Sequence, residues 1–349
     1  MPAVHAVRFT GAGAEYFRIW IVNVALSLIT LGVYSAWAKV RRMNYFYRHT
    51  SLAGSSFEYH GQPIAILKGR ILAVVLLVAW NVAPEIHPVF FLVVFIAGLC
   101  ILPWLITSAL RFRLHNSGYR GLRFRFLGRM GEAAKVFLLY PLFVVVTLGL
   151  AYPYFKWRTK QFFFGHAAFG SLQAKFNAPV RPFYRIYIFV AFLAVLIPLV
   201  VALSLIVYFR NTLGDGSVSD PRELADWAKL LFIAPAVLIS FILYLSIWAF
   251  IRARIHVVCW DGLTVGEHRL SCQLNSWKFA GIALLNLLLI FLTFGLYKPF
   301  SDIRLAGLLA QSIELHCAGD LSNALAGAAA ETRAAGEEAA ELFDVDIGL

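Results

Sequence analysis

The sequence predicts a mainly α-helical polytopic membrane protein with three internal repeats, two transmembrane helical hairpins and short cytoplasmic β-strands. Of its 349 residues, 60% are hydrophobic and 14% are charged, whereas soluble domains average about 45–50% apolar and about 25% charged residues. Several apolar segments approach the ~20 residues that cross a bilayer core, and one interrupted segment recurs three times. We therefore assign residues 1–317 to an integral membrane domain and residues 318–349 to an acidic, Ala/Glu-rich cytoplasmic tail.

Two pairs of apolar segments read as transmembrane hairpins. In "PEIHP" (84–88), two prolines bound a short turn that joins the two halves of a hairpin over 71–110. A polar loop at 210–229 joins the halves of a second hairpin over 186–251, and its Asp220 precedes Pro221 as a helix cap would. The apolar segments run over 19–38, 71–83, 89–110, 136–155, 186–209, 230–251 and 279–297.

The interrupted segment appears as "TLGVYSAWAKVR" (30–41), "TLGLAYPYFKWR" (147–158) and "TFGLYKPFSDIR" (293–304). Displacing the chain by 117 or by 263 residues superposes these segments, and internal similarity of this kind outweighs local predictions. Alternating stretches such as "AVRFTGAG" and "LRFRFLGR" precede the copies, and period-two alternation indicates short strands. The predicted repeats cover about 7–60, 122–177 and 268–318.

The basic residues favour an arrangement in which each repeat segment enters and leaves on the same side. If all seven segments span the membrane, 19 Lys and Arg lie inside and 11 outside, with Arg18 inside the first segment. If the three repeat segments are re-entrant, 27 of the 31 lie inside and three outside, again without Arg18. The positive-inside rule favours the second arrangement. The length of each segment, about 18–20 apolar residues, still allows a full crossing.

The interruption itself contains residues that suit a broken helix. Gly permits a turn, and Thr hydroxyls bond backbone groups at helix breaks or help to form a binding loop in transporters. Asparagines within apolar segments are costly, so they face either a cavity or a partner helix. The predicted polar path or helix break comprises Asn23, Thr30, Gly32, Thr147, Gly149, Asn286, Thr293 and Gly295.

Basic residues follow each interruption at matching positions. Their cationic groups suit the phosphates of anionic headgroups, and they equally suit simple anchoring by snorkelling side chains. The third copy places Asp302 where the first two have lysines. The predicted lipid-phosphate or anchoring residues are Lys39, Arg41, Lys156, Arg158 and Arg304.

Other chemistries have little support in the sequence. His49 and His166 match in register, but no carboxylate or cysteine at fixed spacing completes a metal site. The four cysteines form no CxxC pair, so we expect no metal and no cofactor. The basic loop around "NSGYRG" (116–121) flanks an apolar span, which favours membrane topology over nucleic acid. We find no catalytic motif and expect no enzyme.

Two stretches carry a resemblance to a known family: "EYFRIWIVNVALSLITLGVYSAWAKVRRMNYFY" (15–47) and "LPWLITSALRFRLHNSGYRGLRFRFLG" (102–128). Together with "TLGLAYPYFKWR", they resemble the YjgN family of bacterial inner-membrane proteins, a domain of unknown function, over residues 7 to about 315. The resemblance implies a multi-pass protein of the bacterial cytoplasmic (inner) membrane, and supplies no catalytic residues.

Three functions remain open on the sequence. The first is a small-solute transporter or channel with the polar path between the repeats. The second is a non-enzymatic lipid-binding or membrane-organising protein that binds anionic headgroups. The third, a lipid-modifying enzyme, lacks a recognisable nucleophile or acid/base pair. In each case both termini are expected to be cytoplasmic, the partners are membrane lipids and not nucleic acid, and the sequence does not indicate an oligomeric state.

Overall fold

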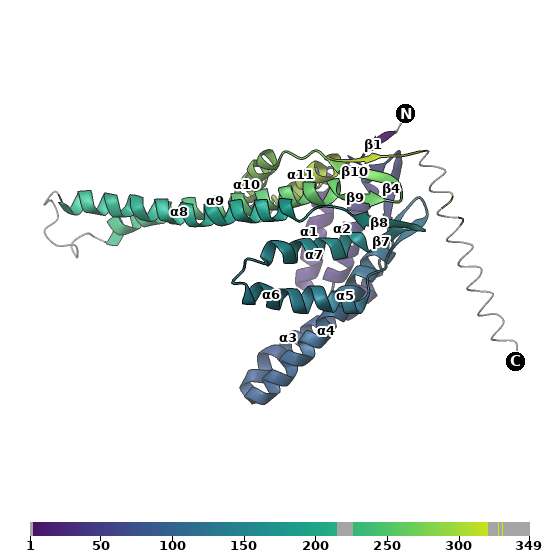
Figure 1. The fold of residues 1–349 in the computed structure, drawn as a ribbon, viewed down its shortest axis with the longest axis horizontal. Coiled ribbons are helices and arrows are strands. Elements are labelled where there is room, and N and C mark those ends of the chain that lie inside the picture. The colour runs from purple at the N-terminus through teal and green to yellow at the C-terminus, as the bar shows by residue number, and fades with distance from the viewer. Residues whose placement is uncertain (1–2, 215–225, 320–326, 328–329, 331–349) are drawn as a thin grey trace. The chain divides into compact units, whose positions relative to one another are not determined.

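The computed structural model describes residues 3–214 and 226–319 together with Gly327 and Ala330. Its β-strands form one eleven-stranded antiparallel sheet (Figure 1). The strands are β1 (Val4–Ala6), β2 (Arg8–Phe9), β3 (Thr50–Leu52), β4 (Ser55–Tyr59), β5 (Ser117–Tyr119), β6 (Leu122–Phe126), β7 (Ala167–Phe169), β8 (Leu172–Phe176), β9 (Leu263–Val265), β10 (His268–Cys272) and β11 (Ile313–His316).

The prediction of a mainly helical protein with only short surface strands was therefore wrong. Each strand has two to five residues, which is too short for its own alternation to reveal a sheet. The sheet arises from pairings between distant segments, such as Phe57 with Tyr119 and Phe126 with Ala167. Such long-range pairing is invisible to local periodicity.

The strand order is that of a meander whose ends meet. Consecutive strands from β2 to β11 are neighbours, and β1 pairs with β11. The two edge strands, β1 and β2, are separated in sequence only by Val7, so the sheet curls into a near-barrel. A small hydrophobic core fills it: Leu52 of β3 packs against both the Leu263–Leu270–Leu315 cluster and the Tyr119–Phe169 cluster.

Successive connections of an antiparallel meander alternate between the two ends of the sheet. Between β2 and β11, the links β3–β4, β5–β6, β7–β8 and β9–β10 are tight turns, and the other five links each contain helices. All five helical connections consequently leave from the same end of the sheet. The tight turns, the start of β1 and the end of β11 lie at the other end.

Residues with positive φ form the tight turns. In β3–β4, Ala53 and Gly54 have φ of 46° and 79°, and in β5–β6, Arg120 and Gly121 have φ of 48° and 77°. Two positive φ values are the mark of type I′ turns, whose twist matches that of the flanking strands. These turns fix the register between neighbouring strands.

The helices are of two kinds: the short helices of the repeats, and the long helices α3, α4, α8 and α9. The bounds are α1 (Gly13–Ile29), α2 (Ser35–Arg48), α3 (Pro63–Ile86), α4 (Pro88–His115), α5 (Met130–Ala134), the π-helix η1 (Lys135–Leu139), α6 (Tyr140–Val146), α7 (Tyr152–Gly165), α8 (Arg181–Gly214), α9 (Asp226–Asp261), α10 (Ser276–Leu292) and α11 (Lys298–Gln311). Among the described residues, four segments are long and apolar enough to cross a bilayer: Pro63–Ile86, Pro88–His115, Arg181–Ser204 and Leu238–Asp261.

The short helices recur at constant spacing. The pair α1–α2 begins at 13 and ends at 48, the segment from α5 to α7 begins at 130 and ends at 165, and the pair α10–α11 begins at 276 and ends at 311. These bounds differ by 117 and by 263 residues, the two displacements found in the sequence. The first helical stretch has 17 residues in each case, counting α5, η1 and α6 together (5 + 5 + 7), and the second has 14.

The chain forms two compact units. The first holds the sheet and comprises Met1–Val180, Val257–Gln273 and Lys298–Leu349; the second comprises Arg181–His256 and Leu274–Tyr297. Helix α10 belongs to the second unit and α11 to the first, so each is described with its own unit. Nearly all of the predicted acidic tail, 318–349, lies outside the described residues.

Candidate functional site: three apolar hairpin tips

Helices α1 and α2 form an antiparallel hairpin, hairpin A, whose tip lies away from the sheet. Tyr16, near the start of α1, stacks on Tyr45, near the end of α2, with ring centroids 5.2 Å apart. The segment from α5 to α7 forms hairpin B in the same way, since Phe137 lies edge-on to Phe162 at 5.9 Å. We call residues 28–33, 145–150 and 291–296 tips A, B and C.

One threonine links the two helices at each tip. The Thr30 hydroxyl donates to the Leu26 carbonyl (2.8 Å) and accepts from the Tyr34 N–H (2.9 Å). The hydroxyl thereby binds the end of one helix to the beginning of the next. Thr147 does the same with Phe143 and Ala151 (2.8 and 3.1 Å), and Thr293 with Leu289 and Tyr297 (2.7 and 3.0 Å).

The residue after each threonine adopts a left-handed conformation although it is not glycine. Leu31, Leu148 and Phe294 have φ of 48°, 50° and 49°, a region that costs L-residues about 1–2 kcal/mol. The glycine that follows, with φ of 90–92°, donates its N–H back to the first helix at 2.7–2.8 Å. This is the six-to-one bond of a Schellman-type helix end.

The left-handed residue projects outward at all three tips. Its exposed fraction is 95% for Leu31, 93% for Leu148 and 98% for Phe294. The rest of each tip is also apolar and exposed: Leu28, Ile29 and Val33 at tip A, Val145, Val146 and Leu150 at tip B, and Phe291, Leu292 and Leu296 at tip C. Contiguous exposed apolar surface of this kind marks a contact with lipid or with another protein.

The long hairpin α3–α4 provides a gauge for the position of tip A. The Arg70 guanidinium of α3 donates to the hydroxyl of Ser35, the first residue of α2. Seventeen residues separate Arg70 from His87, the turn of the long hairpin, which corresponds to about 25 Å of helix. The start of α2 is therefore held about 25 Å along α3 from the far end of the long hairpin, and Leu31 of tip A lies four residues before it.

The basic residues predicted from the repeat lie shortly after the tips. Lys39 and Arg41 are the fifth and seventh residues of α2, about 6–9 Å from its start. Arg41 donates to the Tyr34 hydroxyl at 3.1 Å, whereas Lys39 and Arg304 are exposed. These residues are placed where the apolar tip gives way to polar surface.

The second copy surrounds its cations with aromatic rings. The Arg158 guanidinium lies 5.1–5.7 Å from the ring centroids of Tyr140, Tyr154 and Trp157, and it donates to the Tyr154 hydroxyl at 2.9 Å. Lys156 lies 5.2 Å from the Tyr152 ring. An aromatic and cationic belt of this composition is typical of membrane interfaces.

The third copy differs for a structural reason. Asp302 stands where the other copies have Lys39 and Lys156, and its Oδ2 lies 3.2 Å from Arg42 Nη2 of α2. Its Oδ1 also accepts from Lys298. The carboxylate thus joins α11 to α2 instead of facing a headgroup.

The two asparagines of the predicted polar path are both buried. Asn23 is 7% exposed and Asn286 is 1% exposed. Asn23 Oδ1 and both amide atoms of Asn286 have no hydrogen-bond partner among the described residues, and an orphaned buried polar atom costs about 1–3 kcal/mol. In copy two the equivalent residue is Tyr140.

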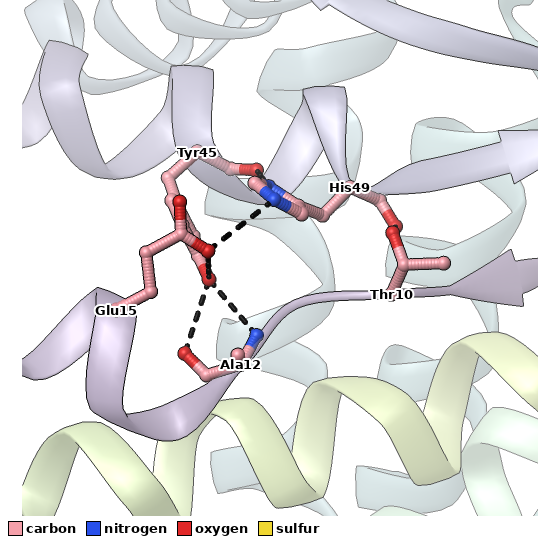
Figure 2. A network of polar contacts seen from close by, with 5 residues as sticks. All are labelled: Thr10, Ala12, Glu15, Tyr45 and His49. Atoms are coloured by element: carbon pink, nitrogen blue, oxygen red, sulfur yellow. Dashed lines mark hydrogen bonds and ion pairs between the residues drawn. The ribbon is translucent and has the colours of Figure 1, made fainter.

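Sequence reasoning missed a carboxylate beside each repeated histidine. Figure 2 shows His49 between the Tyr45 carbonyl, 2.8 Å from Nδ1, and Glu15, whose Oε2 is 3.7 Å from Nε2. In copy two, His166 Nδ1 is 3.1 Å from the Phe162 carbonyl and Nε2 is 2.8 Å from Glu132. The displacement of 117 that superposes the histidines also superposes Glu15 on Glu132, so the signal was present. In each copy Nδ1 faces a backbone carbonyl and Nε2 faces a carboxylate.

Tyr45 completes the network at the base of hairpin A. Its hydroxyl accepts from the Ala12 N–H (2.9 Å) and lies 3.0 Å from both the Ala12 carbonyl and Glu15 Oε2 (Figure 2). Burial raises the pKa of Tyr45, and the Glu15 carboxylate raises it further, while the hydrogen bond with Ala12 opposes them. The phenol therefore stays neutral and holds the start of α1 against the end of α2.

Apolar helices of spanning length, together with exposed apolar tips bordered by aromatic and basic residues, define an integral membrane protein. The family model described as "Bacterial protein of unknown function (DUF898)" matches residues 4–342, and the chain belongs to this family. It is the family that the sequence resemblance indicated.

Curated relatives carry the name inner membrane protein YjgN. The protein from Salmonella typhimurium is 28% identical over 145 residues, which cover 41% of this chain and 37% of the relative. The protein from Escherichia coli O157:H7 is 26% identical over 155 residues, covering 42% and 37%. The aligned stretch thus spans little more than a third of each relative. No solved structure matches the chain.

Proposed function

We propose that this protein is a non-enzymatic lipid-binding or membrane-organising protein of the bacterial inner membrane. In this proposal the long hairpins cross the bilayer, and the three tips dip into the leaflet nearest the sheet. The observation that supports this proposal most directly is that the same strained turn occurs three times. At each turn a Leu or Phe side chain is almost completely exposed.

The topology of the sheet supports a same-side arrangement. Because every helical connection leaves from one end of the meander, each helical segment that departs from the sheet also returns to it. We place the sheet and both termini in the cytoplasm, since 27 of 31 basic residues then lie inside. The three short segments are re-entrant copies of one unit in this arrangement.

The depth of tip A supports shallow insertion. The hydrocarbon core is about 30 Å thick, and the contact of Arg70 with Ser35 lies about 25 Å from the far end of α3–α4. If that end reaches the opposite interface, the contact lies about 5 Å below the nearer interface, and Leu31, four residues before Ser35, lies up to about 6 Å deeper. Interfacial helices commonly bury their apolar face about 5–10 Å into the headgroup and acyl boundary.

The cations following the tips then lie among the headgroups. Guanidinium groups pair with phosphate through two parallel hydrogen bonds, and each cation near an anionic leaflet contributes about 1 kcal/mol. Arg41, Arg158 and Arg304 occupy equivalent positions and are our proposed headgroup ligands, assisted by Lys39 and Lys156.

The test compares two sets of three arginines. Native mass spectrometry of the detergent-purified protein measures how much phosphatidylglycerol and phosphatidylcholine remain bound. Changing Arg41, Arg158 and Arg304 to Gln should remove most of the preference for phosphatidylglycerol. The control changes the strand residues Arg8, Arg123 and Arg269 to Gln, with the same loss of charge. An unchanged preference in the first variant, or an equal loss in both, contradicts the proposal.

A second candidate, a small-solute transporter or channel, is favoured by the orphaned amides of Asn23 and Asn286. Polar groups without partners inside apolar segments suit a passage that admits water or solute. Asn23→Cys and Asn286→Cys, in a background without native cysteines, should react with a membrane-impermeant thiol reagent if a passage exists. Protection of both cysteines from both sides contradicts this candidate.

A further inference from the structure

We infer that Arg70 and Lys39, beside the start of α2 at Ser35, form a site for the phosphate of one bound phospholipid, next to tip A. The inference rests on the proposed function and narrows it to a particular headgroup position. It concerns Arg70, a residue outside the repeat and without an equivalent in the second copy, where Tyr187 stands 117 residues later.

Within the part of the chain that the structure describes, no carboxylate pairs with Arg70 or Lys39. Among the described residues, Arg70 has one hydrogen-bond partner, the neutral Ser35 hydroxyl, which in turn donates to the Gly32 carbonyl. Lys39 lies one helical turn after Ser35, on the same face of α2, and is exposed. The carboxylate of Asp302 is already paired with Arg42 and Lys298.

The fold brings these groups together at a fixed place. Helices α2 and α3 pack together, and the hydrogen bond from Arg70 to Ser35 holds the guanidinium of α3 at the start of α2, one helical turn from Lys39. Arg70 presents further N–H donors in a planar fork, which matches phosphate oxygens. The backbone N–H groups of Ser35, Ala36 and Ala38 are bonded to carbonyls of the preceding turn, so the donors available to an anion are those of the side chains.

The surface beyond the cations is apolar, as an acyl chain requires. Ile71 and Val74 of α3 are 55% and 59% exposed, and the Leu31 side chain of tip A is 95% exposed. A ligand with a phosphate at Arg70 and a hydrocarbon chain directed along α3 would satisfy both surfaces. A free phosphate ion would use only the polar half, so we assign the site to a phospholipid.

The experiment titrates the detergent-purified full-length protein with a short-chain phosphatidylglycerol, and separately with inorganic phosphate. Arg70→Gln should weaken lipid binding about tenfold or more, because hydrogen bonds to charged groups are worth about 1.5–3 kcal/mol. Lys39→Gln should weaken it by a smaller factor, and it serves as the second variant if Arg70→Gln does not fold. Lys68→Gln, on an exposed cation of the same helix, should leave it unchanged.

The outcomes separate this site from the general proposal. If Arg70→Gln and Lys39→Gln bind as the native protein does, while the variant of Arg41, Arg158 and Arg304 loses its lipid preference, the site is wrong and the proposed function stands. If Lys68→Gln is as harmful as Arg70→Gln, the effect is unspecific and the site is also wrong. Binding of inorganic phosphate with the same affinity and the same dependence on Arg70 overturns the assignment to a lipid.

Discussion

Hairpin A and the long hairpin α3–α4 leave the same end of the sheet, yet they are built for different surroundings. Hairpin A ends in a glycine-containing turn held by Thr30, and cations follow within two helical turns. The long hairpin turns at His87 between two proline-containing helices, and Ile71 to Pro84 contains no charged residue. In the proposed placement hairpin A is interfacial and α3–α4 spans the bilayer, and we attribute this difference to where charge resumes along the chain.

The strongest test of this difference between the two hairpins is a charged residue placed in the middle of α3. Leu77 is 64% exposed in a helix of spanning length. Leu77→Arg should raise the free energy of membrane insertion of α3 by about 2.5–3.5 kcal/mol, because the guanidinium would lie near the bilayer centre. The fraction of chains inserted, measured with a glycosylation-based insertion reporter, should fall sharply; full insertion would show that α3 does not face lipid.

The next effect concerns the strained turn. Gly32→Ala places a Cβ where φ is +90°, and this should destabilise hairpin A by about 1–2 kcal/mol. Gly69→Ala is the control, since Gly69 lies inside α3 with open space where the added methyl group would stand, and there Ala should stabilise by about 0.5–1 kcal/mol. Thermal stability in detergent measures both changes, and equal stability of the two variants would mean that the turn is not strained.

This turn also shows what the sequence could predict. The Thr-Leu-Gly and Thr-Phe-Gly triplets predicted helix breaks, because glycine and threonine act locally, and the helices before them end at Ile29, Val146 and Leu292. The apolar runs over 71–110 and 186–251 likewise predicted spanning segments, because twenty apolar residues are a local signal. The sheet was not predictable from strands as short as Arg8–Phe9, whose pairing with Thr50 and Ser51 depends on the intervening hairpin.

The candidate site residues divide in the same way. Arg41, Arg158 and Arg304 were found because their spacing recurs. Glu15 and Glu132 recur with the same spacing, but each lies 34 residues before its histidine, so only the folded hairpin brings the pair together. Arg70 has no repeat equivalent, and only the contact between α2 and α3 reveals it.

The base of hairpin A provides a pH-dependent comparison with the tip. Tyr45→Phe removes the acceptor of the Ala12 N–H and should cost about 1 kcal/mol. The pKa of Tyr45 is raised by burial, so the folded protein holds its phenolic proton more tightly than the unfolded chain. Its contribution is therefore complete below the ordinary tyrosine pKa of about 10 and is lost as pH rises from there through the folded pKa.

Denaturation curves at increasing alkaline pH measure this effect. The difference in stability between the native protein and Tyr45→Phe should shrink as the pH passes about 10 and continue to shrink above it. The Tyr47→Phe variant, which loses one contact with Ser117, is the control for the loss of a tyrosine hydroxyl. A difference that stays constant with pH would contradict the role of the Tyr45 proton.

A smaller effect is expected at the repeated histidines. Glu132→Gln removes an ion pair of 2.8 Å, and Glu15→Gln one of 3.7 Å, with both carboxylates about half exposed. Exposed pairs contribute about 0.2–1 kcal/mol, so both changes should be modest and the first should be the larger. High salt should reduce the difference from the native protein; a loss of several kcal/mol would indicate a function beyond stability.

The smallest effect should come from the tip itself, and it decides between interfacial and deep insertion. Leu31→Arg introduces the same group as Leu77→Arg, but only four residues before Ser35, whose partner Arg70 lies about 25 Å from the far end of α3–α4. A guanidinium near the headgroups can extend to phosphate, and charged groups near an interface cost only about 0–1 kcal/mol in membrane proteins. The same reporter should therefore show nearly full insertion. If Leu31→Arg instead fails as completely as Leu77→Arg, tip A lies deep in the hydrocarbon, and the shallow placement that connects the tips with headgroup binding is wrong.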